Sequence, residues 1–182
     1  MSSPFLYHVG DRLSGPELAA ARLDGELVEI GEAFMPADAV ETPAIRAGSL
    51  RSIAGPQVAL THESAAWVHG AIDHLPPRHS VQRRTPSRIH AVVDRTVRYR
   101  DLCLPSTDTQ FIGGIAVSTP TRTLVDLLRD RVLRDDTSLD VVHAMLRWQP
   151  GLAVSGVQWL ENAGPVHHKR AALAFLRNAI RT

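Results

Sequence analysis

The sequence has one cysteine, few aromatic residues and no long apolar run. Cys103 is the only cysteine among 182 residues, so an internal disulfide or a thiolate cluster for a metal ion is excluded. No apolar segment approaches the roughly 18 residues that span a bilayer, and residues 1–13 lack the basic-then-apolar order of a signal peptide. We therefore expect a cytoplasmic protein without membrane contact. Cys103 lies in an apolar string, so we expect a buried, unreactive thiol.

The whole chain has almost no net charge, but one segment is strongly basic. The formal net charge is +1, which argues against a surface built throughout to hold nucleic acid. Between residues 78 and 101, however, there are seven arginines and only two aspartates. Such a segment predicts contact with an acidic protein surface or a phosphate backbone, although exposed strands carry charge for solubility as well.

The usual motifs of enzymes are missing. There is no nucleophile elbow, no phosphate-binding P-loop and no dinucleotide fingerprint. His62 and Glu63 begin like a helical zinc motif, but Ala66 stands where the second histidine ligand would be. His167 and His168 are neighbours, which in a helix point about 100° apart and cannot share an ion. We expect no metal, no cofactor and no small-molecule substrate. The less favoured alternative is a nuclease-like enzyme that uses His62, Glu63 or His167.

The N-terminal segment predicts a helix followed by a hairpin. Ser14 and Glu17 form a capping box, and Gly25 ends the helix. Leu27–Ile30 and residues 33–35 then form two short strands about a tight turn. A helix followed by a hairpin is the back half of a winged helix, which places a recognition helix in a DNA groove. Only about a dozen residues precede Ser14, so the two preceding helices of a complete unit do not fit.

Two further helices are expected before the main sheet. Thr42 and Pro43 start the first, which we expect to run to Gly55 and to carry two arginines outward. Thr61 caps the second, which covers residues 63–69, ends at Gly70 and is largely buried. The candidate DNA-binding residues of the N-terminal part are Arg22, Arg46 and Arg51.

The centre of the chain has the alternation of β-strands. Residues 88–93 and Val97–Arg100 alternate in polarity and predict a hairpin joined at Asp94 and Arg95, with one face toward a core and the arginines outward. A third short strand is expected over residues 112–117. The candidate partner-binding face consists of Arg83, Arg84, Arg88, Arg98 and Arg100.

The C-terminal third is predicted to be helical. Thr119 and Pro120 start a helix in which Arg122 can pair with Asp126 one turn later. Further helices are expected over residues 139–148, 154–162 and 167–180. The fold class is therefore α+β: a shortened winged-helix-like unit, then a mixed α/β domain with a small antiparallel sheet and a helical C-terminal part.

Two strings carry a family resemblance. The first is ALTHESAAWVHG, residues 59–70, and the second is GIAVSTPTRTLVDLL, residues 114–128. In type, order and separation they resemble the motifs of AbiEi antitoxins of type IV toxin-antitoxin systems, in their actinobacterial form. The residues of these strings that we assign to the structural motif are Thr61, Trp67, Gly70, Thr119, Pro120, Arg122 and Asp126.

The resemblance implies a function. Residues 1–40 would be the winged-helix-like segment and residues 41–182 the AbiEi-like α/β antitoxin domain. In that family the winged helix represses the operon's own promoter, and the second domain counteracts a nucleotidyltransferase toxin. The expected partners are therefore promoter DNA and a cognate toxin. The alternative is a protein-interaction module without DNA binding, which contacts its partner through the basic face.

Overall fold

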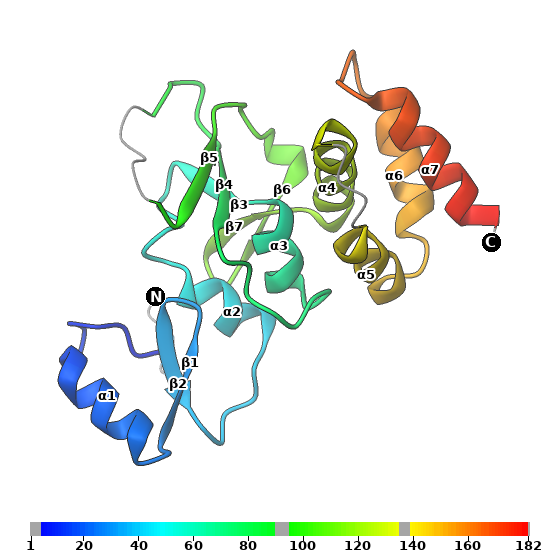
Figure 1. Ribbon diagram of the computed structural model, residues 1–182. Coiled ribbons are helices and arrows are strands. Elements are labelled where there is room, and N and C mark those ends of the chain that lie inside the picture. Colours follow the sequence, from blue (N-terminus) through cyan, green and yellow to red (C-terminus); the bar gives the residue numbers. More distant parts are fainter. Residues whose placement is uncertain (1–4, 90–94, 135–138, 182) are drawn as a thin grey trace.

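The computed structural model describes residues 5–89, 95–134 and 139–181, in which seven α-helices combine with two sheets (Figure 1). The elements follow in the order α1 (Gly15–Leu23), β1 (Leu27–Ile30), β2 (Ala33–Pro36), α2 (Pro43–Ser49), β3 (Val58–Leu60), α3 (His62–His69), β4 (His79–Arg83), β5 (Val97–Arg100), the 3₁₀ turn η1 (Ser106–Asp108), β6 (Thr109–Ile112), β7 (Ile115–Ser118), α4 (Pro120–Arg134), α5 (Asp140–Trp148), α6 (Leu152–Asn162) and α7 (Lys169–Arg181). The α+β class is confirmed.

The N-terminal helix and hairpin form where the sequence predicts them. The Ser14 backbone N–H and hydroxyl both donate to the Glu17 carboxylate at 2.7 Å, which is the predicted capping box. Strands β1 and β2 pair antiparallel, and Tyr7 exchanges two backbone hydrogen bonds of 2.9 Å with Phe34 on β2. Side chains from this hairpin, such as Met35, join the same apolar cluster as the main sheet. The unit therefore lies at one end of the molecule but shares the sheet's core (Figure 1).

The main sheet is mixed, so the prediction of a small antiparallel sheet is wrong. Its strand order is β5-β4-β3-β7-β6; the pairs β4·β5 and β3·β7 are parallel, whereas β3·β4 and β6·β7 are antiparallel. Strand β5, the second strand of the predicted hairpin, pairs parallel with β4. Of the first predicted strand, Arg88 and Ile89 are not in a strand, and residues 90–93 lie outside the described residues.

Two strands replace the single strand predicted over residues 112–117. Gly113 and Gly114 form the turn between β6 and β7, with φ of +56° and +82°. At Gly113 a Cβ atom would lie 2.8 Å from the Ala44 carbonyl oxygen, so the turn requires glycine both for its backbone conformation and for its close approach to α2. Helix α2 itself ends at Ser49, earlier than predicted, and the chain continues in turns.

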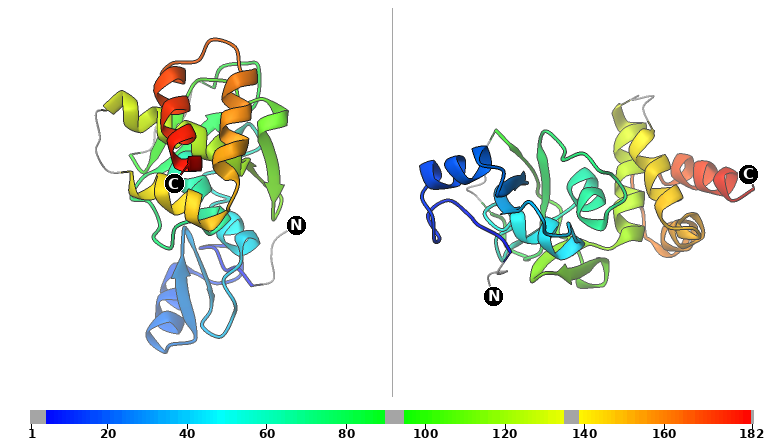
Figure 2. Two further views of the ribbon diagram at one scale, coloured as in Figure 1. Left: turned by 90° about the vertical axis from the view of Figure 1, so that its right-hand side faces the viewer. Right: turned by 90° about the horizontal axis from the view of Figure 1, so that it is seen from below.

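Two apolar cores meet at helix α3. Ala65 and Val68 pack into the cluster formed with the sheet and the N-terminal hairpin, whereas Ala66 packs into the cluster formed by helices α4 to α7. Figure 2 shows these last four helices gathered at the end of the molecule opposite α1. No helix in the described part of the chain is long and apolar enough to cross a membrane. Helix α3 thus joins the sheet to the helical part, and the polar groups considered next lie near this junction.

Candidate functional site

Arg122 is the centre of a buried ion-pair network at the start of α4. It is 8% exposed, and its guanidinium donates to Asp126 and to Asp108, each at 2.7 Å. The same guanidinium lies 5.3 Å from the ring centre of Trp159, whose indole N–H donates to Asp108 at 2.9 Å. Burial opposes the positive charge of Arg122, but the two carboxylates more than offset this and raise its pKa above the usual value. The predicted pairing of Arg122 with Asp126 is confirmed, and the network ties α4 to η1 and α6.

Thr119 and Pro120 begin α4 as predicted. The Thr119 hydroxyl accepts a 3.3 Å hydrogen bond from the Arg122 backbone N–H, which is the contact of an N-cap, and Pro120 is the first helical residue. These residues fix where α4 starts and therefore where Arg122 lies.

The first motif string surrounds helix α3. Thr61 is the N-cap residue, and Gly70 ends the helix with a left-handed φ of +84°. Trp67 is buried, with the Arg46 guanidinium 5.2 Å from its ring centre. His69 is also buried, and its Nε2 lies 2.9 Å from the Ser118 carbonyl oxygen. These contacts give the string a role in packing.

His62, the first residue of α3, has an unusual conformation and environment. Its φ of +53° is in the left-handed region, which a non-glycine residue rarely adopts. The side chain is buried, with Nδ1 3.0 Å from the Thr61 hydroxyl. Burial, and after it the charges of Arg100 and Arg122, hold the pKa of His62 well below its usual 6.5. The imidazole is therefore neutral at pH 7.

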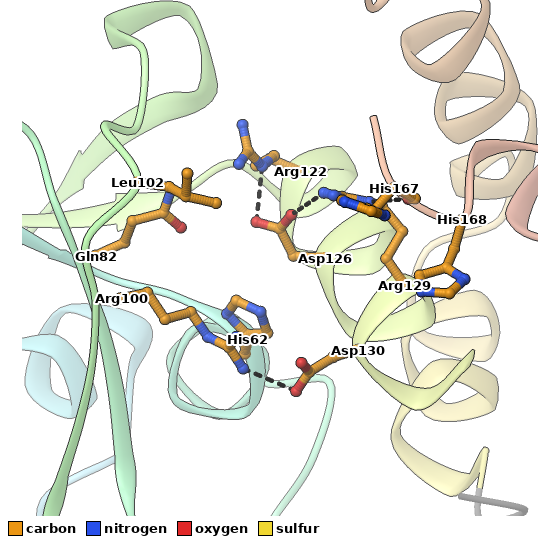
Figure 3. A pocket seen from close by; sticks show the side chains of 10 residues that line it. All are labelled: His62, Gln82, Arg100, Leu102, Arg122, Asp126, Arg129, Asp130, His167 and His168. Carbon is orange, nitrogen blue, oxygen red and sulfur yellow. Dashed lines mark hydrogen bonds and ion pairs between the residues drawn. The ribbon is translucent and has the colours of Figure 1, made fainter. Parts of the chain in front are cut away.

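His62 lines a cavity of about 350 Å³ between the sheet and the C-terminal helices (Figure 3). Five parts of the chain form it: α3, the strands β4 and β5, the segment after β5, α4, and the loop before α7. Its lining residues are His62, Gln82, Arg100, Leu102, Arg122, Asp126, Arg129, Asp130, His167 and His168. Arginine and histidine side chains thus converge on the cavity from several directions. Within the described part of the chain no cluster of three or more histidine, cysteine or acidic side chains could hold a metal ion.

Gln82 and Arg100 form one wall of the cavity. They are Cα partners in the β4·β5 pair, so their side chains project from the same face of the sheet. One guanidinium nitrogen of Arg100 donates to Asp130 on α4 at 2.8 Å (Figure 3). Its Nε and the Gln82 Nε2 are both buried donors without a hydrogen-bond partner among the described residues. The site therefore contains two N–H donors that the described part of the fold does not use.

A comparison with family models gave one decisive match. The model of the AbiEi antitoxin C-terminal domain matches residues 57–155, which is more than half of the chain. This chain belongs to the AbiEi antitoxin family. The match runs from the turn before β3 into α6 of this AbiEi protein and includes both motif strings. Members of this family are generally not enzymes.

Other comparisons add little about the AbiEi protein. A search of curated protein sequences gave no match. Among solved structures, the Rv2827c protein from Mycobacterium tuberculosis is similar, with 17% identity, a TM-score of 0.38, and coverage of 94% of this chain and 76% of that chain. A similarity at that level carries no argument about fold or function.

The arginines predicted to bind a partner do not share one outward face. Arg83 is 15% exposed at its side chain and donates to the backbone carbonyls of Asp101, Thr85 and Pro86 at 2.6–2.9 Å, so it holds together the segment after β4. Arg100 points into the cavity. Arg98 lies two residues before Arg100 on β5 and is the Cα partner of Ser80 on β4. It therefore projects from the same face of the sheet as Arg100.

Arg84 and Arg88 remain near the surface. The Arg84 guanidinium lies 4.8 Å from the ring centre of Phe111, which is 63% exposed. Arg88 is 75% exposed at its side chain and pairs with Asp101 at 3.1 Å. The expectation of a continuous outward arginine face is therefore wrong, but part of the basic segment is accessible beside exposed apolar groups.

The arginines predicted to bind DNA are also divided. Arg22 on α1 is half-exposed and pairs with Glu29 of the hairpin at 3.3 Å. Arg51 pairs with Asp11 and is about one-third exposed. Arg46, expected to point outward, is instead 12% exposed at its side chain and donates to the backbone carbonyls of Trp67 and Ile72 at 2.7 and 3.0 Å. Its position is that of a structural residue in this AbiEi protein.

Sequence reasoning did not identify the cavity. His62 and His167 were candidates only for a metal site or a nuclease, and Gln82, Arg129 and Asp130 were not candidates at all. One signal could have indicated that α4 contributes to a site. Charged residues recur on it at intervals of four, at Arg122, Asp126 and Asp130, on a helix that is otherwise apolar on its buried side. No comparable signal exists for Gln82, because the polar residues of β4 are buried on both faces of the sheet. Cys103 is exposed, contrary to prediction.

Proposed function

We propose that this chain is an antitoxin that counteracts a nucleotidyltransferase toxin and contacts it directly. The observation that supports this most is the match of residues 57–155 to the AbiEi antitoxin C-terminal domain. The match covers the whole five-stranded sheet and, within the Arg122 network, Asp108, Arg122 and Asp126; Trp159 lies beyond it.

The proposed contact surface consists of Arg84, Arg88, Leu102 and Phe111. Leu102 and Phe111 are 67% and 63% exposed, which leaves large apolar side chains in water. Arg84 stacks on Phe111, and Arg88 pairs with Asp101, the neighbour of Leu102 in the chain. Arginine and aromatic side chains, phenylalanine among them, are enriched at protein–protein interfaces. Arg100 is left out because its side chain lines the cavity instead of the outer surface.

The experiment is co-expression with the nucleotidyltransferase encoded next to this gene. The double variant Arg84→Glu and Arg88→Glu should reduce co-purification of the toxin at least tenfold and weaken rescue of growth. The control is Arg177→Glu, because Arg177 is exposed on α7 and pairs only across the surface with Glu161. An unchanged complex in the double variant would remove this surface from the proposal, and growth rescue without any complex would contradict direct contact.

A second candidate function is repression of the protein's own promoter through the N-terminal unit. Its support is the order of α1, β1 and β2, a helix followed by a wing-like hairpin at one end of the molecule (Figure 1). The charge of this unit opposes the idea: residues 1–40 contain seven acidic residues and two arginines, a balance of −5 before histidines are counted. A phosphate backbone is repelled by such a surface, so the charge favours the module without DNA binding.

Gel-shift titration on the upstream promoter DNA at several salt concentrations separates these alternatives. A repressor should bind with an affinity that falls as salt rises, and Arg22→Glu should weaken it further. The absence of salt-sensitive binding by the intact chain would dismiss the repressor function and leave the antitoxin proposal unaffected.

A further inference from the structure

The cavity in Figure 3 concentrates features that cost folding free energy. In the described part of the chain, three buried side-chain atoms have no hydrogen-bond partner, and two of them, Gln82 Nε2 and Arg100 Nε, belong to residues that line it. The two non-glycine residues with positive φ in that part, His62 and His168, also line it. Unsatisfied buried donors and strained backbone are both unfavourable, and they gather where a binding site needs them.

From this convergence we propose that the cavity is a binding site for a phosphate group. The unused groups on the sheet side are both N–H donors, so the complementary ligand is an acceptor. Gln82 is 2% exposed and lies in the wall of the cavity, so its amide reaches a ligand only inside it.

The residues that line the cavity carry an excess of positive charge. Three arginines, Arg100, Arg122 and Arg129, outnumber the two carboxylates of Asp126 and Asp130, and a third carboxylate, that of Asp108, lies outside the lining on the far side of Arg122. The low pKa of His62, caused by burial and then by these arginines together with Arg98, indicates positive potential at the same place. An anion relieves that potential, because it adds negative charge without displacing the existing ion pairs.

The directions of the polar groups select a tetrahedral anion. Gln82 and Arg100 approach from the sheet, Arg129 from α4, and His167 and His168 from the opposite loop (Figure 3). A planar carboxylate accepts hydrogen bonds mainly in its own plane, whereas phosphate accepts them on all sides. The volume of about 350 Å³ is at the lower end for small-molecule sites, so it fits inorganic phosphate or the phosphate end of a mononucleotide.

The test is calorimetric titration of the full chain with inorganic phosphate, with a nucleoside monophosphate and with acetate as separate probes. Saturable binding of phosphate, and weak or no binding of acetate, is expected. Tighter binding of the nucleoside monophosphate would identify a phosphate ester as the source of the group, and tighter binding of inorganic phosphate would identify the free ion. Equal binding of acetate, or no binding of either phosphate compound at millimolar concentration, would overturn the proposal.

Two variants locate the site. Gln82→Met and Arg100→Lys each remove one unpaired donor, and Arg100→Lys keeps the positive charge next to Asp130; each should weaken phosphate binding at least tenfold. The matched controls are Gln110→Met on β6 and Arg177→Lys on α7, which lie outside the cavity lining and should bind phosphate normally. Unchanged binding in both cavity variants would overturn the assignment.

Folding and toxin contact are measured separately. Gln82→Met removes a donor that the unliganded fold leaves unpaired, so its Tm without phosphate should be no lower than that of the natural chain. Its Tm should no longer rise when phosphate is added. A phosphate-induced rise in Tm that persists in this variant would contradict the proposal. Leu102 belongs to both the cavity lining and the proposed contact surface, but Arg84 and Arg88, the residues changed in the toxin experiment, lie outside the lining. Failure of phosphate binding and failure of toxin binding are therefore distinguishable.

Discussion

Replacement of Arg122 by methionine should destabilise the protein strongly. Methionine keeps most of the side-chain volume but removes the charge that neutralises Asp108 and Asp126. The side chains of these carboxylates are only 10% and 5% exposed, so water cannot replace the lost partner. Breaking a buried ion pair from one side costs about 3–5 kcal/mol. Since a domain is stable by roughly 5–15 kcal/mol, this is a large share of the total.

Urea unfolding followed by far-ultraviolet circular dichroism measures the loss. With a slope of about 2 kcal/mol per molar urea, the midpoint should fall by about 1.5–2.5 M while the slope stays constant. Arg177→Met is the control, because the exposed Arg177–Glu161 pair should contribute under about 1 kcal/mol. If both variants shifted the midpoint equally, the buried network would not be what stabilises this part of the fold.

A second substitution tests the cause. Adding Asp126→Leu to Arg122→Met removes one of the two stranded carboxylates, so part of the lost stability should return, by about 1 kcal/mol or more. Arg129 would lose its 3.3 Å contact to Asp126 but keep its 2.8 Å hydrogen bond to the His167 carbonyl oxygen. If the double variant were less stable than Arg122→Met, the cost would come from lost packing and not from an unpaired buried charge.

The free energy of unfolding should also fall as the pH drops from about 7.5 to 5.5. In the unfolded chain His62 binds a proton near pH 6.5, whereas in the folded chain burial lowers its pKa and the imidazole stays neutral. His62→Asn should reduce the pH dependence of the free energy of unfolding by up to about 1.4 kcal/mol per pH unit. The smaller contributions of His8 and His69, whose pKa values are also lowered by burial, should remain. Urea unfolding at both pH values measures this pH dependence, and an unchanged value in the variant would contradict the prediction. Gly70→Ala should lower the free energy of unfolding by about 1 kcal/mol, because alanine is strained at a φ of +84° although no atom lies closer than 3.9 Å to its Cβ. Gly55→Ala, at a position with open space and no positive φ, should cost clearly less in the same assay.

The sequence was sufficient where local chemistry decides the structure. The capping box at Ser14, the glycine at the end of α3 and the proline at the start of α4 each specify a boundary through backbone hydrogen bonds or φ within a few residues. The pairing of Arg122 with Asp126 follows in the same way from the geometry of one helical turn. All four features lie where the sequence predicts them.

The sheet was mispredicted because strand pairing is not local. His79–Arg83 is polar in composition, yet its first four residues are buried on both faces, so no alternation marks it as a strand. Without β4, the strand Val97–Arg100 had no partner except its neighbour in sequence, which led to the predicted hairpin. The parallel pairing places Arg100 beside Gln82, and only this register brings the two donors together. The cavity was therefore beyond prediction from composition and spacing.

The Arg122 network and the cavity share Arg122, Asp126 and Arg129, but the polar groups of the network are fully hydrogen-bonded, whereas two of those on the sheet side of the cavity are not. Arg122 donates to two carboxylates that in turn accept from Trp159 and Arg129, so the network is closed by the fold. Arg100 donates to Asp130 through one nitrogen, and its Nε has no hydrogen-bond partner in the part of the chain that the structure describes. A closed network stabilises the junction of sheet and helices, whereas an open one loses free energy until something accepts its hydrogen bonds. Helix α4 carries residues of the Arg122 network and of the cavity lining. The hydrogen bonds of the network therefore hold the cavity residues in place, which is the pre-organisation that a ligand site requires.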